Sequence, residues 1–259
     1  MIILQKLWIL YKKEGISKDF LRGACTGAAQ ILKRTYTQLF QRLDGIPSSW
    51  DLRTNGVYRH NPNASGGDKV LYLTFDTEWV KPENVDHILD TLKEKQVPAT
   101  FFITGERMKE NAPFVQRIRV EGHTVGNHTM NHPILPRCTP EEISKELNQC
   151  AECYHTLTGE VMPKLMRPPY GEVDIRTIKY LHNLGYQSCL WNMHVFDWKK
   201  DEPATWDVFK SYLDTDLKNG AIILQHSFSD ETTAHIGKYI DYCHSKGYRF
   251  GNLREFISF

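Results

Sequence analysis

Residues 71–79 read Leu71-Tyr-Leu-Thr-Phe-Asp76-Thr77-Glu78-Trp79, an apolar run that stops at two acidic residues. A short apolar run of this kind is typical of a buried strand, which would carry the acids at its C-terminal end. An ionised carboxylate is costly to bury without a partner, so packing alone gives no reason for Asp76 to be there. The stretch therefore predicts a strand that ends at a chemically active position.

Segments that read as strands and as helices alternate from Lys69 onward. The strands are expected near 70–75, 98–103, 123–126, 164–166, 186–191, 221–225 and 248–250, and the helices near 83–95, 111–121, 140–157, 174–184, 204–217 and 230–246. Alternation of this kind predicts an α/β fold with a parallel sheet, either open or closed into a barrel.

Polar residues follow the predicted strands at their C-terminal ends. They are Asp76, His128, Arg167, Asp197 and His226. Active sites of parallel α/β folds assemble along this rim of the sheet. We therefore expect these side chains to share one site.

Length and composition limit the number of domains and the kinds of partner that we expect. Its 259 residues are enough for one large α/β domain, with or without an appendage. A formal net charge of +1 gives no reason to expect nucleic acid as a partner. Residues 1–45 are more basic, with eight Lys and Arg against three Asp and Glu. A solvated helix face explains this excess, and association with an anionic membrane surface is the alternative.

The N-terminal quarter differs from the rest of the chain. Residues 1–45 have apolar positions at helical spacing, and a turn-rich bridge follows as far as Gly67. We expect a helical extension and linker over 1–66 and a catalytic domain over 67–259. No segment reaches the roughly 20 apolar residues that span a bilayer. The first residues also lack the cleavage site of a signal peptide.

His128 and His132 are the candidate metal ligands. Their four-residue spacing predicts that both imidazoles lie on one face of a helical turn, within reach of one ion. The pair alone is weak evidence, but it lies beside the acidic strand end. A catalytic zinc site has three protein ligands, and a carboxylate within residues 76–78 is the natural third. The sequence thus indicates a metal-dependent hydrolase.

Arg167 precedes Pro168 and Pro169, which fix the backbone and present Tyr170 and Gly171 at a tight turn. One interpretation is a purely structural turn with a surface arginine. In the functional interpretation, Arg167 holds a carboxylate ionised while a backbone N–H near Tyr170 faces a developing oxyanion.

His226 ends an apolar strand and is either a core histidine or a general acid oriented by Asp197. Trp198 is interpreted equally well as a wall for a sugar ring or as part of the core.

In this order, the residues resemble the polysaccharide deacetylases of carbohydrate esterase family 4, the NodB-homology domain, over about residues 68–257. The matching motifs are Thr74-Phe75-Asp76, Gly126-Asn-His128-Thr-Met-Asn-His132-Pro, Arg167-Pro-Pro-Tyr170-Gly171, Asp197-Trp198 and Ile223-Leu224-Gln225-His226. The longer similarity looks most like the muramic acid deacetylases that form the δ-lactam of the spore cortex.

The resemblance implies a distorted (β/α) barrel and a divalent metal, zinc first, with cobalt, nickel or manganese as alternatives. It implies Asp76 as the general base on a metal-bound water, with both histidines as ligands and Arg167 as the tether of Asp76. His226, tuned by Asp197, would protonate the leaving amine. Leu224 would line the pocket for the acetyl methyl group.

Thr77 departs from the family pattern, which has a second aspartate at this position. In one interpretation Glu78 takes over as the metal ligand, and this is the one we favour because base, acid and tether are all present. In the second, the two histidines hold the ion alone and more weakly. In the third, the metal is lost and the protein is a catalytically impaired glycan binder.

The expected function is hydrolysis of N-acetyl groups on an aminosugar polymer, either peptidoglycan or a chitin-like glycan. A small amide or formamide substrate is the alternative among enzymes. The substrate class favours an extracytoplasmic or cell-wall location, whereas the six cysteines and the lack of a signal peptide oppose it. The oligomeric state is left open.

Overall fold

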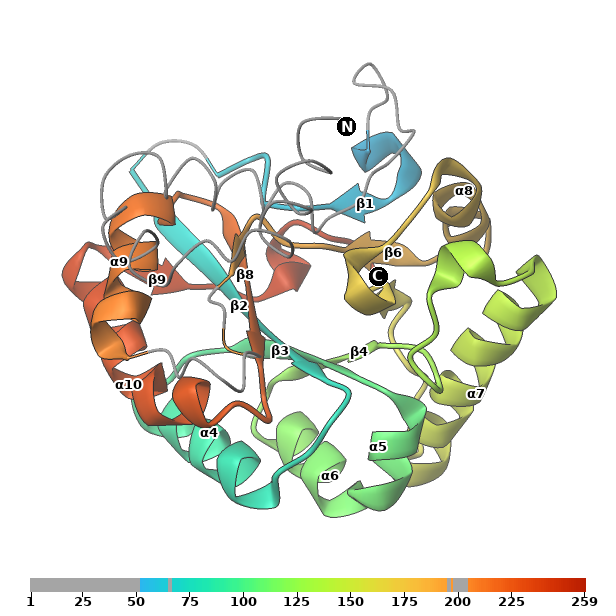
Figure 1. Cartoon of the computed structure of the whole chain (residues 1–259), viewed down its shortest axis with the longest axis horizontal. Coiled ribbons are helices and arrows are strands. Elements are labelled where there is room, and N and C mark those ends of the chain that lie inside the picture. The colour runs from blue at the N-terminus through green and yellow to red at the C-terminus, as the bar shows by residue number, and fades with distance from the viewer. Residues whose placement is uncertain (1–51, 65–66, 195–196, 198–204) are drawn as a thin grey trace, which may run out of the picture. The chain divides into compact units, whose positions relative to one another are not determined.

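The computed structural model describes residues 52–64, 67–194, 197 and 205–259 (Figure 1). Most of the predicted extension over residues 1–66 therefore lies outside the described residues, and so does Trp198. No helix in the described ranges has the length and apolar character needed to cross a membrane.

The centre of the described chain is one sheet of short strands. These are β1 (Val57–Tyr58), β2 (Lys69–Thr77), β3 (Ala99–Ile103), β4 (Thr124–Asn127), β5 (Leu165–Met166), β6 (Gln187–Cys189), β7 (Met193–His194), β8 (Ala221–His226) and β9 (Tyr248–Phe250). Their order is β1-β6-β5-β4-β3-β2-β8-β7, with β9 paired to the start of β2. Every strand pair is parallel, as the alternation of elements predicts.

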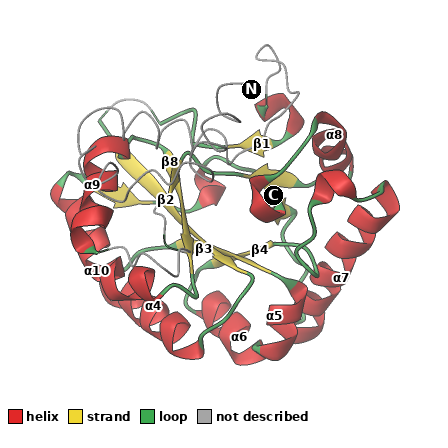
Figure 2. Cartoon of the chain, viewed as in Figure 1, coloured by secondary structure: helices red, strands yellow, loops and turns green. Residues whose placement is uncertain are grey.

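Helices cover the outside of this sheet (Figure 2). They are α4 (Pro82–Lys95), α5 (Gly105–Glu110), α6 (Ala112–Val120), α7 (Pro140–Thr158), α8 (Ile175–Asn183), α9 (Trp206–Asp216) and α10 (Asp230–Ser245). Short 3-10 helices span Arg53–Asn55, Leu135–Arg137, Pro169–Gly171 and Leu253–Glu255. The sheet curls into a barrel that is incomplete, because among the described residues no pairing joins the outer strands β1 and β7. The predicted distorted (β/α) barrel is confirmed.

The two faces of β2 contact different parts of the core, because side chains alternate along a strand. Leu71, Leu73 and Phe75 belong to the cluster that includes the buried side chains of α4 and α10. Val70 and Tyr72 belong to the cluster inside the curl of the sheet. Asp76 continues the inner series, so the barrel interior is the face on which the strand presents its carboxylate.

Besides the short 3-10 helices, two strands and one α-helix were not expected from the sequence. β1 and β7 contain two residues each, and α5 is a six-residue helix directly before α6. β1 pairs with β6, so Val57 and Tyr58 belong to the sheet although they lie before the expected domain boundary at residue 67. All the strands and helices that the sequence predicted from Lys69 onward are present, with small shifts of their ends.

Candidate active site

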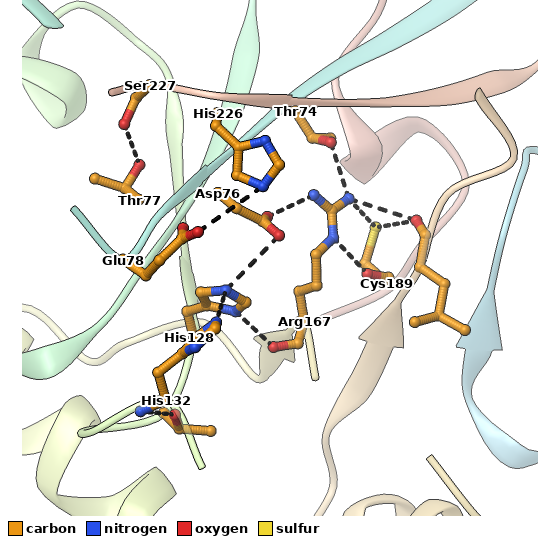
Figure 3. A network of polar contacts seen from close by, with 12 residues as sticks. Thr74, Asp76, Thr77, Glu78, His128, His132, Arg167, Cys189, His226 and Ser227 are labelled. Carbon is orange, nitrogen blue, oxygen red and sulfur yellow. Dashed lines mark hydrogen bonds and ion pairs between the residues drawn. The ribbon is translucent and has the colours of Figure 1, made fainter. Parts of the chain in front are cut away.

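The candidate residues come from the C-terminal ends of separate strands (Figure 3). Asp76 is the second-last residue of β2, His128 directly follows β4, and Arg167 directly follows β5. His226 ends β8, and Asp197 lies between β7 and α9. The curl of the sheet brings these strand ends together, as expected for a parallel barrel.

Arg167 is fully buried and bonded through each nitrogen of its guanidinium group. Its Nη1 donates to Asp76 Oδ1 at 2.7 Å, its Nη2 to Thr74 Oγ1 at 2.8 Å, and its Nε to the carbonyl of Cys189 at 2.8 Å. Burial would raise the pKa of Asp76, but the charges of Arg167, His128 and His226 outweigh it and hold that pKa below its usual value. Asp76 is therefore an ionised carboxylate inside the barrel.

His226 has the opposite charge state. Its Nδ1 lies 2.8 Å from Asp197 Oδ1, and Asp197 Oδ2 accepts from the His226 backbone N–H and from the hydroxyl of Thr232, each at 2.7 Å. Burial lowers the pKa of His226, but Asp197 and the nearby Glu78 and Asp76 raise it to about 9. His226 is thus an imidazolium at neutral pH, with Asp197 fixing its ring.

His128 and His132 converge, but the expected helical turn is wrong. Residues 128–134 form no helix, and Thr129 and His132 have positive φ values of 67° and 60°. The resulting loop brings the two Nε2 atoms to 3.1 Å. His128 Nδ1 lies 2.8 Å from the carbonyl of Arg167, a contact in which the ring nitrogen donates and the carbonyl accepts. Burial is the largest cause that lowers the pKa of His132, to about 3, so the His132 ring is neutral at pH 7.

Glu146 of α7 holds this loop, and the sequence analysis missed it. Its Oε2 accepts from the backbone N–H groups of Met130 and Asn131 at 2.9 and 2.8 Å, and its Oε1 accepts from the Asn131 side chain. The positive φ of Thr129 is costly for a β-branched residue and persists only where surrounding contacts enforce it. A glutamate far along a predicted helix gives no sequence signal for this role, because the contact is tertiary.

Thr77 and Glu78 point to different sides of β2 (Figure 3). The Thr77 hydroxyl accepts from Ser227 at 2.9 Å. Glu78 follows the inner series of Asp76, and its Oε1 lies 3.8 Å from His226 Nε2. Its Oε2 is buried without a hydrogen-bond partner, and burial raises the pKa of Glu78.

The donors suit a divalent metal only in part. Two imidazoles and a carboxylate form a donor set typical of catalytic zinc, and the unbonded Glu78 oxygen lacks a partner such as a metal would provide. Within the described ranges, however, no three His, Cys, Asp or Glu side chains are grouped as a metal site. The structure brings the two histidines together, while the ion-pair contact of Glu78 is with His226.

The remaining candidates line the same rim. Tyr170 is half exposed at a positive φ of 60°, with its ring 4.6 Å from that of His132. Gly171 follows at a φ of 66°, and a Cβ there would lie 2.7 Å from the Trp191 ring. Leu224 is buried in the inner cluster of the barrel. Trp198 is outside the described residues, so its role as a sugar wall stays a prediction.

Comparison with known proteins assigns the family. Residues 63–189 match the family model described as polysaccharide deacetylase. The peptidoglycan N-acetylmuramic acid deacetylase PdaA of Bacillus subtilis is 31% identical over 73% of this chain and 72% of its own length. The chain belongs to the polysaccharide deacetylase family. It is therefore a member of a family of deacetylases, which are amide hydrolases.

Solved structures agree with the family assignment. The Bc1960 peptidoglycan N-acetylglucosamine deacetylase superimposes with a TM-score of 0.73 at 30% identity, over 82% of this chain and 97% of that chain. A carbohydrate esterase family 4 pseudoenzyme of Bacillus anthracis superimposes with a TM-score of 0.69 at 28% identity, over 78% of this chain and 69% of that chain. Polysaccharide deacetylases thus share this fold with a protein described as a pseudoenzyme.

Proposed function

We propose that the protein is a metal-dependent hydrolase that removes N-acetyl groups from an aminosugar polymer. The observation that carries the proposal is that Asp76, paired with Arg167, and His226, paired with Asp197, are register partners at one rim of the barrel. Amide hydrolysis needs a base that takes a proton from water and an acid that gives one to the leaving amine. Two titratable groups whose environments push their pKa values apart are suited to these two roles.

His128, His132 and Glu78 are the proposed ligands of a divalent metal, zinc first and cobalt, nickel or manganese as alternatives. When bound, the metal supplies a Lewis acid that polarises the amide carbonyl and lowers the pKa of water. The convergence of the two Nε2 atoms at 3.1 Å and the unbonded carboxylate oxygen of Glu78 support this assignment.

The other side chains act on Asp76, on His226 or on the substrate. Arg167 keeps Asp76 ionised, and Asp197 keeps His226 protonated. The Tyr170 backbone N–H is the proposed donor to the developing oxyanion, because the neighbouring N–H groups of Gly171 and Glu172 donate to the carbonyls of Pro168 and Pro169. In this proposal Leu224 receives the acetyl methyl group and Trp198 borders the sugar.

The substrate class comes from the relatives. Proteins named peptidoglycan N-acetylmuramic acid, peptidoglycan N-acetylglucosamine and chitooligosaccharide deacetylases all match this chain, and they favour peptidoglycan or a chitin-like glycan. We also propose that the predicted catalytic domain over residues 67–259 includes β1, which lies within the expected extension over 1–66 but pairs with β6. Membrane association through the basic segment of the extension stays a prediction.

Metal analysis combined with acetate release tests the proposal. Purified protein is loaded with zinc, cobalt, nickel or manganese, and acetate is measured from N-acetylglucosamine oligomers and from peptidoglycan. We expect one bound metal per chain and acetate release that Asp76→Asn abolishes. Glu78→Ala should lower the metal content, whereas Glu83→Ala, on the surface of α4, should not. Acetate release that is unchanged in Asp76→Asn would refute the base assignment.

Glycan binding without turnover is the second candidate. One observation favours it: Thr77 stands where the family has a carboxylate, and its hydroxyl is engaged by Ser227. Binding of the oligomers with neither stoichiometric metal nor acetate release would support this candidate. Acetate release from acetamide, or formate release from formamide, without acetate release from the oligomers would instead favour the small-amide alternative.

A further inference from the structure

The carboxylate of Asp197 is held by two residues in the described part of the chain. Its Oδ1 accepts from the ring Nδ1 of His226, and its Oδ2 accepts from the His226 backbone N–H and from the hydroxyl of Thr232. Asp197 itself belongs to no helix or strand, because it lies between β7 and α9. Among the described residues, Thr232 therefore supplies the one bond to this carboxylate that does not come from the proposed acid itself.

The Thr232 bond restricts the direction in which the carboxylate faces. The torsion that turns an aspartate carboxylate about its last carbon–carbon bond is broad, so bonds to the two oxygens decide its orientation. Thr232 and the His226 backbone N–H both bind Oδ2 at 2.7 Å, which leaves Oδ1 directed at the His226 ring at 2.8 Å. Loss of the hydroxyl would free this rotation and leave a buried oxygen short of one donor.

The fold, rather than Asp197, fixes the position of the Thr232 hydroxyl. Thr232 is fully buried in the first turn of α10, and its backbone N–H donates to the N-cap Ser229 Oγ at 3.1 Å. Asn84 of α4 holds the same turn, because its side chain donates to the carbonyl of Phe228 at 3.0 Å and to Asp230 at 2.8 Å. A β-branched side chain on such a turn has few rotamers, so its hydroxyl is directed before Asp197 binds it.

We propose that Thr232 is a positioning residue for the deacetylation: its hydroxyl orients Asp197, and Asp197 aims the His226 ring at the leaving amine. The inference rests on the proposed function for the role of His226 as the acid. Thr232 acts through Asp197 and takes no part in binding the glycan. Its removal should therefore slow proton transfer and leave substrate binding unchanged, so that kcat falls and KM does not rise.

Acetate release from the N-acetylglucosamine tetramer by the full chain tests the inference. Thr232→Val keeps the shape of the side chain and removes the hydroxyl. A general acid contributes about 10²- to 10⁴-fold to the rate, and loss of its orientation removes part of this, so we expect kcat to fall about tenfold at constant KM. Thr232→Ser, which keeps the hydroxyl, should restore most of kcat.

Thr233→Val is the matched control in the same turn. The Thr233 hydroxyl bonds to the carbonyl of Ser229 at 2.8 Å, within α10. This variant removes a hydroxyl from the same helix without touching Asp197, so it should keep the kcat of the wild type.

Nuclear magnetic resonance on protein with ¹⁵N-labelled histidine gives a readout that needs no turnover. The proton on His226 Nδ1 is assigned by its loss in His226→Gln. A proton in a persistent hydrogen bond exchanges slowly with water, so its signal should be present in the wild type, Thr232→Ser and Thr233→Val. In Thr232→Val it should be broadened or lost by exchange.

Four results would overturn the inference. They are a kcat in Thr232→Val within twofold of the wild-type value, a loss that appears in KM rather than in kcat, an equal loss in Thr233→Val, and an Nδ1 proton that is as protected in Thr232→Val as in the wild type. A wild-type protein that releases no acetate would refute the proposed function, and the protection of the Nδ1 proton would then decide by itself whether Thr232 orients the pair.

Discussion

Asp76 and His226 are direct register partners on the adjacent parallel strands β2 and β8. Neighbouring strands are about 4.8 Å apart, so an ionised carboxylate and a protonated imidazole stand side by side at the end of the sheet. Arg167 pairs with Asp76, and Asp197 pairs with His226. The pair thus depends on two further buried charges, and each can be removed separately.

Removal of the Asp197 charge should move the alkaline limb of the pH–rate profile. His226 acts as an acid in its protonated form, so kcat/KM should fall as pH rises through about 9. Because Asp197 raises the pKa of His226, Asp197→Asn should shift this limb to lower pH. Rates of acetate release between pH 6 and 10 measure the shift. An alkaline limb at the same pH in both proteins would exclude His226 as the titrating acid.

Arg167→Met should destabilise the fold strongly, because it leaves the buried carboxylate of Asp76 without its cation. Breaking a buried pair in this way costs about 3–5 kcal/mol in the free energy of unfolding. Chemical denaturation at pH 7 measures it, and the double variant Asp76→Asn/Arg167→Met should lose less than the sum of the single variants. Additive losses would contradict direct coupling.

An exposed ion pair of equal length provides the control. Lys210 and Asp214 are also 2.7 Å apart but lie on the surface, so Lys210→Met should change the stability far less.

The stability that the Asp76–Arg167 pair contributes should also depend on pH. Because the pKa of Asp76 is depressed in the folded protein, the pair stabilises the fold above the pKa that Asp76 has in the unfolded chain. This stabilisation is lost as pH falls through the folded pKa.

Much of the fold was predictable because long elements carry strong periodic patterns. β2 and α7 have nine and nineteen residues, enough for the apolar spacing and the capping residues to mark them. The two-residue strands β1 and β7 are too short to show any alternation. They exist because their neighbours β6 and β8 offer backbone partners.

The candidate site was predictable in its residues but not in its local geometry. Strand ends show where side chains gather, and Asp76, Arg167 and His226 could be found in this way. The loop from His128 to His132 could not, because its left-handed residues are fixed by Glu146 and Asn127, through contacts that a local pattern does not contain. The partners of Thr77 and Glu78 likewise depend on β8.

Glu146→Ala should weaken metal binding by loosening this loop. Residues that orient metal ligands typically contribute 10- to 100-fold in metal affinity, so we expect the Kd for zinc to rise by about that factor. Glu146→Gln keeps an acceptor oxygen, so its Kd for zinc should lie between those of the wild type and Glu146→Ala. Competition with a chelator measures the affinity.

Glu142→Ala is the matched control on the same helix, because Glu142 only closes the capping box of α7 with Thr139. It should lower the melting temperature without a change in the Kd for zinc. Equal losses of zinc affinity in the Glu142 and Glu146 variants would show that helix stability, rather than the clamp on the loop, controls the site.

Gly171→Ala should destabilise the fold and perturb the Arg167 environment. The position has a φ of 66°, and the new Cβ would lie 2.7 Å from the Trp191 ring, which in turn lies 5.4 Å from the guanidinium of Arg167. Strain at positive φ costs about 1–2 kcal/mol, and the clash adds about 1–3 kcal/mol more. Gly159→Ala separates the cost of the positive φ from the cost of the clash, because its φ is 73° and nothing lies within 4 Å of the added Cβ. Denaturation should therefore show a larger loss at Gly171, and equal losses would mean that Trp191 yields without cost.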